Sequence, residues 1–171
     1  MTRPEAFDFA RPDDDWATLA SRRRDTPVKG LAELRRLTAK FAYGAVLTVQ
    51  AFTFWPMRWR AAMLRSLGLR LSHDTYIADR CYFKGFGLIT EGKVVMNTGC
   101  HLDAAGQIIL EDGTGLACEV MIVTSSHEIG DETWRAGPVL RKPVRICSGA
   151  WIGARAMILP GVTVAPGCVI A

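Results

Sequence analysis

Three histidines are the side chains of this protein best suited to exchanging a proton near neutral pH, because a free imidazole has a pKa of about 6.5. One of them, His127, lies in the segment TSSHEIG, residues 124–130, where a regular pattern in the chain stops. Such a histidine can act as a general base that takes the proton of an attacking hydroxyl or amine. A histidine after two serines does not define a site by itself, so its meaning depends on the surrounding elements.

The cysteines give little support for a disulfide framework or a zinc site. There are five, Cys81, Cys100, Cys118, Cys147 and Cys168, an odd number without any CxxC pair. This favours reduced thiols in a cytoplasmic protein over a disulfide framework or a zinc site. No metal is expected.

A six-residue repeat organises the chain on both sides of the interruption. Small residues follow most of its aliphatic positions four residues later, and Pro–Gly or Ser–Gly pairs stand at the corners. The aliphatic positions are Leu110, Leu116, Ile122, Ile146, Ile152, Ile158, Val164 and Ile170. A weaker form of the repeat appears at Leu71, Ile77, Phe83, Met96 and Leu102.

Each six-residue unit predicts a short strand and a tight turn, with the aliphatic side chain pointing inward. Three units per coil give a triangular prism whose coils stack about 4.8 Å apart around one aliphatic column. Because Cys81, Cys100 and Cys118 lie about one coil apart, we expect these three thiols to stack as small fillers inside it.

The segment ICSGAWIGARAMILPGVTVAPGCVIA resembles the hexapeptide-repeat acyltransferases, in particular those that acetylate sugars and polysaccharides. The resemblance covers about residues 69–171 and implies an all-β main body, a left-handed parallel β-helix, with a protruding loop at about 127–143. It also implies a homotrimer with its active sites between neighbouring subunits. Members continue with further coils, so the resemblance implies that C-terminal coils are missing from a chain that ends at Ala171.

In this family an acyl group passes directly from a coenzyme A thioester to the acceptor, and the resemblance makes His127 the general base. It makes Asn97 a residue that contacts the acceptor, with Asp103 as a second contact. A turn residue that closes a coil is an equally good interpretation of Asn97. Ala104 and Ala105 replace an acidic residue of some sugar acetyltransferases, so their acceptor preference does not transfer.

The resemblance also suggests how the donor is bound. Trp151 matches the residue that lines the pantetheine channel, although packing on an outer face would also explain a tryptophan there. Gly153 and Ala154 match the backbone that hydrogen-bonds the pantetheine arm. Arg135, Arg141 and Lys142 could meet phosphates or the acceptor, or be ordinary surface charges.

The N-terminal part differs in character from the repeat. Residues 1–30 form a polar tail, and residues 31–68 predict a basic and apolar helical appendage. Residues 22–70 hold eleven Lys and Arg against Asp25 and Glu33, whereas residues 73–171 hold eight against ten acidic residues. The helices either cap the first coil or lie in a membrane interface, because the apolar stretch 41–57 is shorter than the roughly 20 residues of a span.

Together these features predict an enzyme that transfers acetyl from acetyl-CoA to a hydroxyl of a sugar, such as a cell-envelope or exopolysaccharide precursor. We expect a cytoplasmic protein, peripheral to the inner face of the membrane, without nucleic acid as a partner. One alternative is a non-catalytic β-helical scaffold. Another is a metalloenzyme similar to the γ-class carbonic anhydrases, which needs two histidines five positions apart; His73, His101 and His127 contain no such pair. The sequence leaves open the acceptor, oxygen or nitrogen as nucleophile, and acetyl or a longer acyl group.

Overall fold

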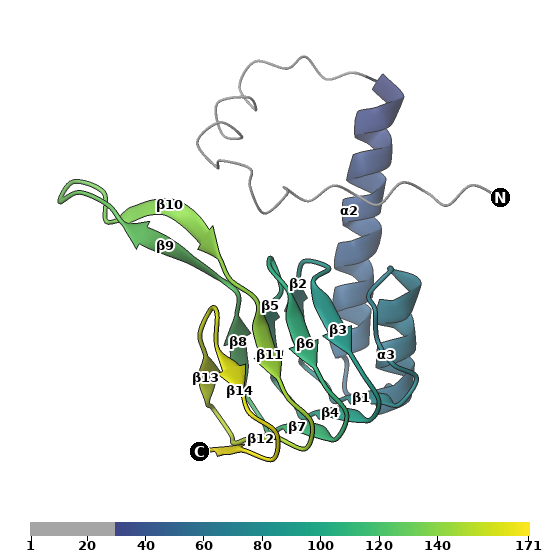
Figure 1. The fold of residues 1–171 in the computed structure, drawn as a ribbon. Coiled ribbons are helices and arrows are strands. Elements are labelled where there is room, and N and C mark those ends of the chain that lie inside the picture. The colour runs from purple at the N-terminus through teal and green to yellow at the C-terminus, as the bar shows by residue number, and fades with distance from the viewer. Residues whose placement is uncertain (1–29) are drawn as a thin grey trace.

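The computed structural model describes residues 30–171. The predicted polar tail, residues 1–30, lies outside the described residues except for Gly30, where the first helix begins. Two helices, α2 (Gly30–Ala51) and α3 (Met57–Ser66), precede a parallel β-helix of stacked coils (Figure 1). The fold class predicted from the repeat, a β-helix with an N-terminal helical appendage, is therefore confirmed.

The coils form three parallel sheets, one on each side of a triangular prism. We name each sheet after its first strand. The β1 sheet contains β1 (Thr75–Ile77), β4 (Val94–Met96), β7 (Thr114–Leu116), β12 (Trp151–Ile152) and β15 (Val169–Ile170). The β2 sheet contains β2 (Tyr82–Lys84), β5 (His101–Asp103), β8 (Met121–Val123) and β13 (Met157–Ile158). The β3 sheet contains β3 (Leu88–Thr90), β6 (Ile108–Leu110), β11 (Val144–Ile146) and β14 (Thr163–Val164).

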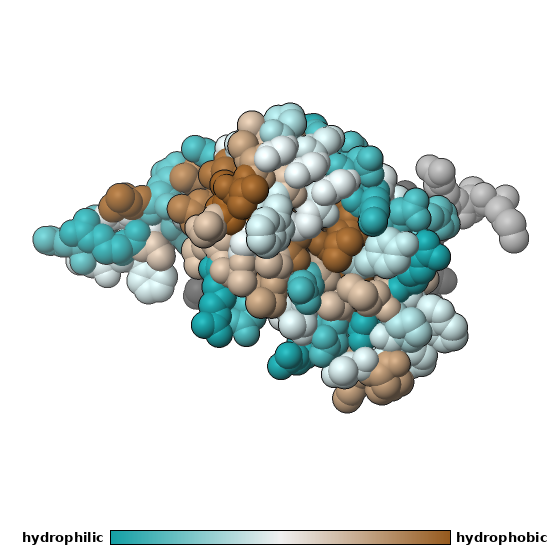
Figure 2. Space-filling model, turned by 90° about the horizontal axis from the view of Figure 1, so that it is seen from below, coloured by the Kyte–Doolittle hydropathy of each residue, from teal (hydrophilic) through white to brown (hydrophobic). Residues whose placement is uncertain are grey.

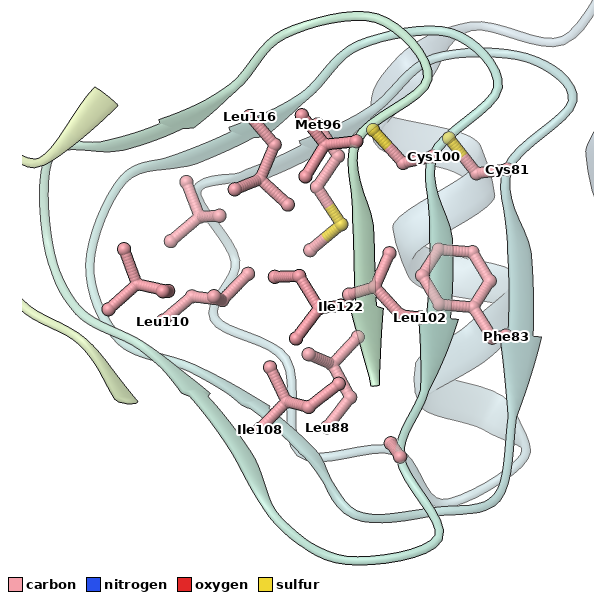
Figure 3. Packing of buried hydrophobic residues seen from close by; sticks show 14 of the residues in the cluster. Cys81, Phe83, Leu88, Met96, Cys100, Leu102, Ile108, Leu110, Leu116 and Ile122 are labelled. Atoms are coloured by element: carbon pink, nitrogen blue, oxygen red, sulfur yellow. The ribbon is translucent and has the colours of Figure 1, made fainter. Parts of the chain in front are cut away.

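The aliphatic positions of the repeat point into the prism as predicted (Figure 3). In the β2 sheet, Phe83, Leu102 and Ile122 stand in register on successive coils and are buried. Full burial of each such side chain stabilises the fold by about 1.5–3 kcal/mol, so the stack is what holds the coils together. Two of the small positions, Ser126 and Val162, are exposed.

One expectation about the thiols is wrong. Cys81 and Cys100 are buried side by side in the column, but the next coil places Val120 there. The reason is coil length, because His101 pairs with Met121, 20 residues on, whereas Cys118 follows Cys100 by only 18. Cys118 therefore lies in the preceding turn, where it is half-buried.

All variation in coil length falls at one corner, between the β2 and β3 sheets. Along the β1 sheet, Thr75 pairs with Val94 and Val94 with Thr114, which are steps of 19 and 20 residues. The next step, from Gly115 to Trp151, takes 36 residues, and the last, from Trp151 to Val169, takes 18. The 18-residue excess of the third coil is the interruption around His127, and it leaves the prism at this corner.

The helices meet the first coil. Ala61 and Leu64 of α3 belong to the buried core, and α3 lies against β1. The Tyr43 hydroxyl of α2 donates to the carbonyls of Phe83 and Gly85, at 3.2 and 3.3 Å, and burial raises its pKa to about 12. Among the described residues, no helix is long and apolar enough to cross a membrane.

Candidate active site

The interruption is a β-hairpin, which we call the arm, rather than an irregular loop. Strands β9 (Ser125–Ile129) and β10 (Ala136–Arg141) pair in antiparallel fashion and project from the prism (Figure 1). Thr124 anchors its root, because its hydroxyl donates to the Asp103 carbonyl at 2.7 Å and accepts from the Gly106 N–H at 2.7 Å. These bonds orient the arm relative to the coils below it.

His127 lies on the arm, paired with Val139 and exposed to solvent. Its Nδ1 is 2.6 Å from the carbonyl oxygen of Gly137. Since a carbonyl only accepts hydrogen bonds, Nδ1 carries the hydrogen, and in the neutral ring Nε2 keeps a free lone pair. The arm thus presents an oriented imidazole whose outer nitrogen can accept a proton.

Asp103, predicted to contact the acceptor, lies at the root of the arm and is buried. Its Oδ2 accepts hydrogen bonds from Ser125 Oγ at 2.5 Å and from Lys84 Nζ at 3.2 Å, and Oδ1 accepts from the Ala105 N–H at 3.3 Å. Burial alone would raise the pKa of this carboxyl, but the bonds from Ser125 and Lys84 outweigh burial and hold the pKa below its ordinary value. Most of the hydrogen-bonding capacity of Asp103 is therefore used within the protein.

Asn97 lies at a different corner, in the turn between β4 and β5. It is exposed, and its Oδ1 accepts the N–H of the next residue, Thr98, at 2.7 Å. His127 leaves the prism at the corner between the β2 and β3 sheets. The fold therefore does not bring Asn97 and His127 to one corner of a single chain.

The predicted donor-binding residues lie on the side of Asn97. Trp151, in β12, is 55% exposed and lies across Gly115 on the outer face of the β1 sheet. Figure 2 shows hydrophobic residues gathered on this underside, and Val169 is 61% exposed beside Trp151. The Gly153 N–H already donates to the Ile170 carbonyl at 2.6 Å, whereas the Ala154 N–H forms no hydrogen bond with any described residue.

The sequence did not predict three features of the site around His127. These are the bond from His127 to the Gly137 carbonyl, the bond from Ser125 to Asp103, and the position of Arg141 beside His127. All three depend on the hairpin register, for which the repeat carries no signal. The rings of His101 and Tyr82 are in contact, with centroids 4.7 Å apart and planes tilted by 36°. Within residues 30–171, no group of three His, Cys, Asp or Glu side chains could hold a metal ion.

The stacked coils and the repeat define a class, that of the hexapeptide-repeat β-helices, and solved structures agree. A galactoside acetyltransferase in complex with coenzyme A superposes with a TM-score of 0.64 at 17% identity, over 84% of this chain and 71% of that one. A hexapeptide-repeat acetyltransferase from Vibrio cholerae gives 0.64 at 19% identity, over 83% and 78%. A maltose O-acetyltransferase from Clostridium difficile 630 gives 0.60 at 24% identity, over 84% and 79%. The chain shares the fold of these acetyltransferases.

Two proteins of known name are similar to this chain in sequence. Nodulation protein L of Rhizobium leguminosarum bv. viciae is 35% identical over 107 residues, which are 62% of this chain and 56% of that protein. Nodulation protein L of Rhizobium meliloti (strain 1021) is 38% identical over 79 residues, 46% and 43% of the two chains. The chain spans about half the length of these curated relatives. No protein-family model matches it.

Proposed function

We propose that this protein transfers an acetyl group from acetyl-CoA to a hydroxyl group of a sugar, such as a precursor of a cell-envelope or extracellular polysaccharide. One observation carries the proposal: His127 stands on an arm of a hexapeptide-repeat β-helix with Nδ1 held by the Gly137 carbonyl and Nε2 free to accept a proton. The shared fold with galactoside and maltose acetyltransferases supports the substrate class.

The mechanism needs only one proton carrier. Nε2 of His127 takes the proton of the acceptor hydroxyl as its oxygen attacks the thioester carbonyl carbon, and a tetrahedral oxyanion forms. When that intermediate collapses, the carbon–sulfur bond breaks, the acetyl ester remains on the sugar, and the imidazolium returns its proton to the coenzyme A thiolate. A positioned base contributes about 10²–10⁴-fold to the rate. The Gly137 carbonyl holds the ring in the tautomer that this requires.

The decisive experiment measures thiol release from acetyl-CoA with a panel of sugars. His127→Ala should lower kcat by at least about 10²-fold, while Glu128→Ala, on the opposite side of the same strand, should stay within about threefold of wild type. If an acceptor is turned over and His127→Ala leaves the rate within a few-fold, His127 is not the base. If no acceptor is turned over and immobilised coenzyme A does not retain the protein, a non-catalytic scaffold is the better interpretation.

We also infer a homotrimer with its sites between subunits. The support is the separation of predicted residues, because Asn97, Trp151 and Ala154 lie along one side of the prism and the arm leaves from another corner. Two inactive variants, His127→Ala and Asn97→Ala, should therefore regain activity when unfolded and refolded together. In a mixed trimer, one interface joins an intact His127 to an intact Asn97. Failure to recover activity, or a monomer in light scattering, argues against shared sites.

We further infer that the elbow between α2 and α3 touches an anionic membrane surface. Phe52, Phe54 and Trp59 are exposed there in a chain of neighbouring aromatic rings. Between Glu33 and Asp74 the chain has seven Lys and Arg residues, of which Arg60 is buried, and no acidic residue. Aromatic rings beside cations suit the interface of an anionic bilayer.

Vesicle sedimentation tests the membrane contact. The protein should sediment with vesicles that contain phosphatidylglycerol and much less with pure phosphatidylcholine vesicles. Phe54→Ser combined with Trp59→Ser should abolish sedimentation, whereas Trp134→Ser, an exposed tryptophan at the tip of the arm, should not. Equal sedimentation of the double variant and the wild-type protein would contradict the membrane contact.

We also infer a cytoplasmic location, which the unpaired state of the five cysteines supports.

A further inference from the structure

One side of the arm continues the outer surface of the β2 sheet beyond the end of β8, and it carries Arg141 as well as the imidazole. Cross-strand pairing matches His127 with Val139 and Ser125 with Arg141. Paired residues and residues two apart share one side of a hairpin, so Ser125, His127 and Arg141 lie on the same side. Ser125 Oγ donates to Asp103 of β5 at 2.5 Å, which identifies this as the side that meets the β2 sheet.

Among the residues that the structure describes, Arg141 has no partner on this side of the arm. It is half-buried, its Nε is buried, and its guanidinium forms no hydrogen bond or ion pair with any described residue. The nearest carboxylate by position, Asp103, already accepts bonds from Lys84 and Ser125. Glu128 lies on the opposite side of β9. A buried donor without a partner is costly, so the guanidinium is suited to receive an anion from outside the chain.

The charge around Arg141 also favours an anion. Lys84 and Asp103 form an ion pair at 3.2 Å and neutralise each other, so the guanidinium leaves this surface with one excess positive charge. A guanidinium binds a carboxylate or a phosphate through two parallel hydrogen bonds, which gives direction as well as attraction. His127 and Arg141 are diagonal neighbours on the hairpin, about 7–8 Å apart in such a geometry. One small molecule can therefore reach both.

We propose that the acetyl acceptor is an acidic sugar, whose carboxylate or phosphate group binds Arg141. A hydroxyl on the same sugar then reaches Nε2 of His127, the diagonal neighbour of Arg141 on the arm. This proposal rests on the proposed acetyl transfer for the hydroxyl contact only, because the contact between the anion and Arg141 requires no reaction.

Calorimetric binding without acetyl-CoA tests the proposal separately from the activity. The probes are a neutral hexose, the corresponding uronic acid and the hexose 6-phosphate. The wild-type protein should bind one or both acidic probes at least tenfold more tightly than the neutral one, and the stronger of the two identifies the anion. Arg141→Gln should remove this preference and Arg141→Lys should keep part of it. Arg135→Gln, at the tip of the arm, should leave it unchanged, because the Arg135 side chain bonds only to the Gly130 carbonyl among the described residues.

The outcomes separate the two proposals. Equal binding of neutral and acidic probes, or acidic binding that Arg141→Gln leaves intact, overturns the acidic acceptor. If the acidic probes bind through Arg141 but no thiol is released from acetyl-CoA, the binding site stands and the acetyl transfer fails. In turnover assays Arg141→Gln should raise KM for the acidic acceptor at least tenfold and leave KM for acetyl-CoA within about twofold. The reverse pattern would assign Arg141 to the donor phosphates and overturn the proposal.

Discussion

Arg60 of α3 joins the helices to the first coil, and its removal gives a sharp test of how the appendage is held. The side chain is 2% exposed. Its Nε donates to the Gln50 carbonyl at 2.8 Å and Nη1 to the Ile77 carbonyl at 3.2 Å. Nη2 donates to the carbonyls of Phe52 and Thr53, at 2.8 and 3.1 Å. A single guanidinium thus satisfies the carboxyl end of α2 and the end of β1, where helix carbonyls otherwise lack partners.

The expected loss of stability depends on which carbonyl groups have no other hydrogen-bond donor once Arg60 is removed. Arg60→Met keeps most of the apolar stem, but it leaves the carbonyls of Gln50 and Ile77 buried without a partner. Each such group costs about 1–3 kcal/mol, whereas the Phe52 and Thr53 carbonyls can turn to water. Because a buried cation is also removed, part of this loss is offset, and we expect a net destabilisation of about 3 kcal/mol.

Arg58 provides a matched control on the same helix. Its side chain is 62% exposed, and it contacts Asp74 at 3.4 Å and the Tyr76 hydroxyl at 2.8 Å. Exposed ion pairs and cation–π contacts contribute little, so Arg58→Met should change the free energy of unfolding by no more than about 1 kcal/mol. Urea unfolding followed by circular dichroism measures both variants, and tryptophan fluorescence from the elbow reports on helix docking. If the free energy of unfolding of Arg60→Met lies within about 0.5 kcal/mol of the wild-type value, the reasoning is refuted.

Two further perturbations test the corner that carries the arm. A Cβ added at Gly87 would lie 1.8 Å from the Gly106 carbonyl oxygen, so Gly87→Ala must push two coils apart and should prevent soluble expression or sharply lower Tm. Gly44→Ala, with nothing within 4 Å in a helix, should leave Tm unchanged or slightly raised; equal Tm values for both variants would count against the close packing. The lowered pKa of Asp103 means that its stabilisation is present above the ordinary carboxyl pKa of about 4 and is lost as the pH falls through the lower folded-state pKa. Ser125→Ala removes a bond that lowers this pKa, so the difference in urea midpoint between pH 7 and pH 3 should shrink, and an unchanged difference would contradict the assignment.

The repeat alone was enough to predict the prism. Inward aliphatic residues at a six-residue spacing, such as Leu110, Leu116 and Ile122, are buried as expected. This success has a physical cause, because each coil buries its residues against the coil before it, so the pattern is local and repeats along the chain. Helix α3 was also readable, since it ends near a glycine, Gly68, with a positive φ of 98°.

The position of His127 was readable for the same reason, because an interruption is visible against a regular background. The surroundings of His127 were not. Whether the interruption forms a loop or a hairpin, and which side of it faces the β2 sheet, depends on pairing between residues of β9 and β10 that no six-residue pattern specifies. The roles predicted for His127, Asn97 and Trp151 stay predictions, although the structure gives each a definite position.

Two examples mark the boundary between sequence and tertiary structure. The sequence was sufficient to place Cys81 and Cys100 in the core, but Cys118 was misplaced because one coil takes 20 residues where another takes 18. Likewise, Arg141 reads as an ordinary surface charge until the hairpin register sets it beside His127, where no carboxylate in the described part of the chain pairs with it. Periodic burial is encoded within a few consecutive residues, whereas contacts at the corner depend on how far each coil extends before the next one stacks on it. The repeat therefore determines the column, and only the folded chain determines what gathers at its corner.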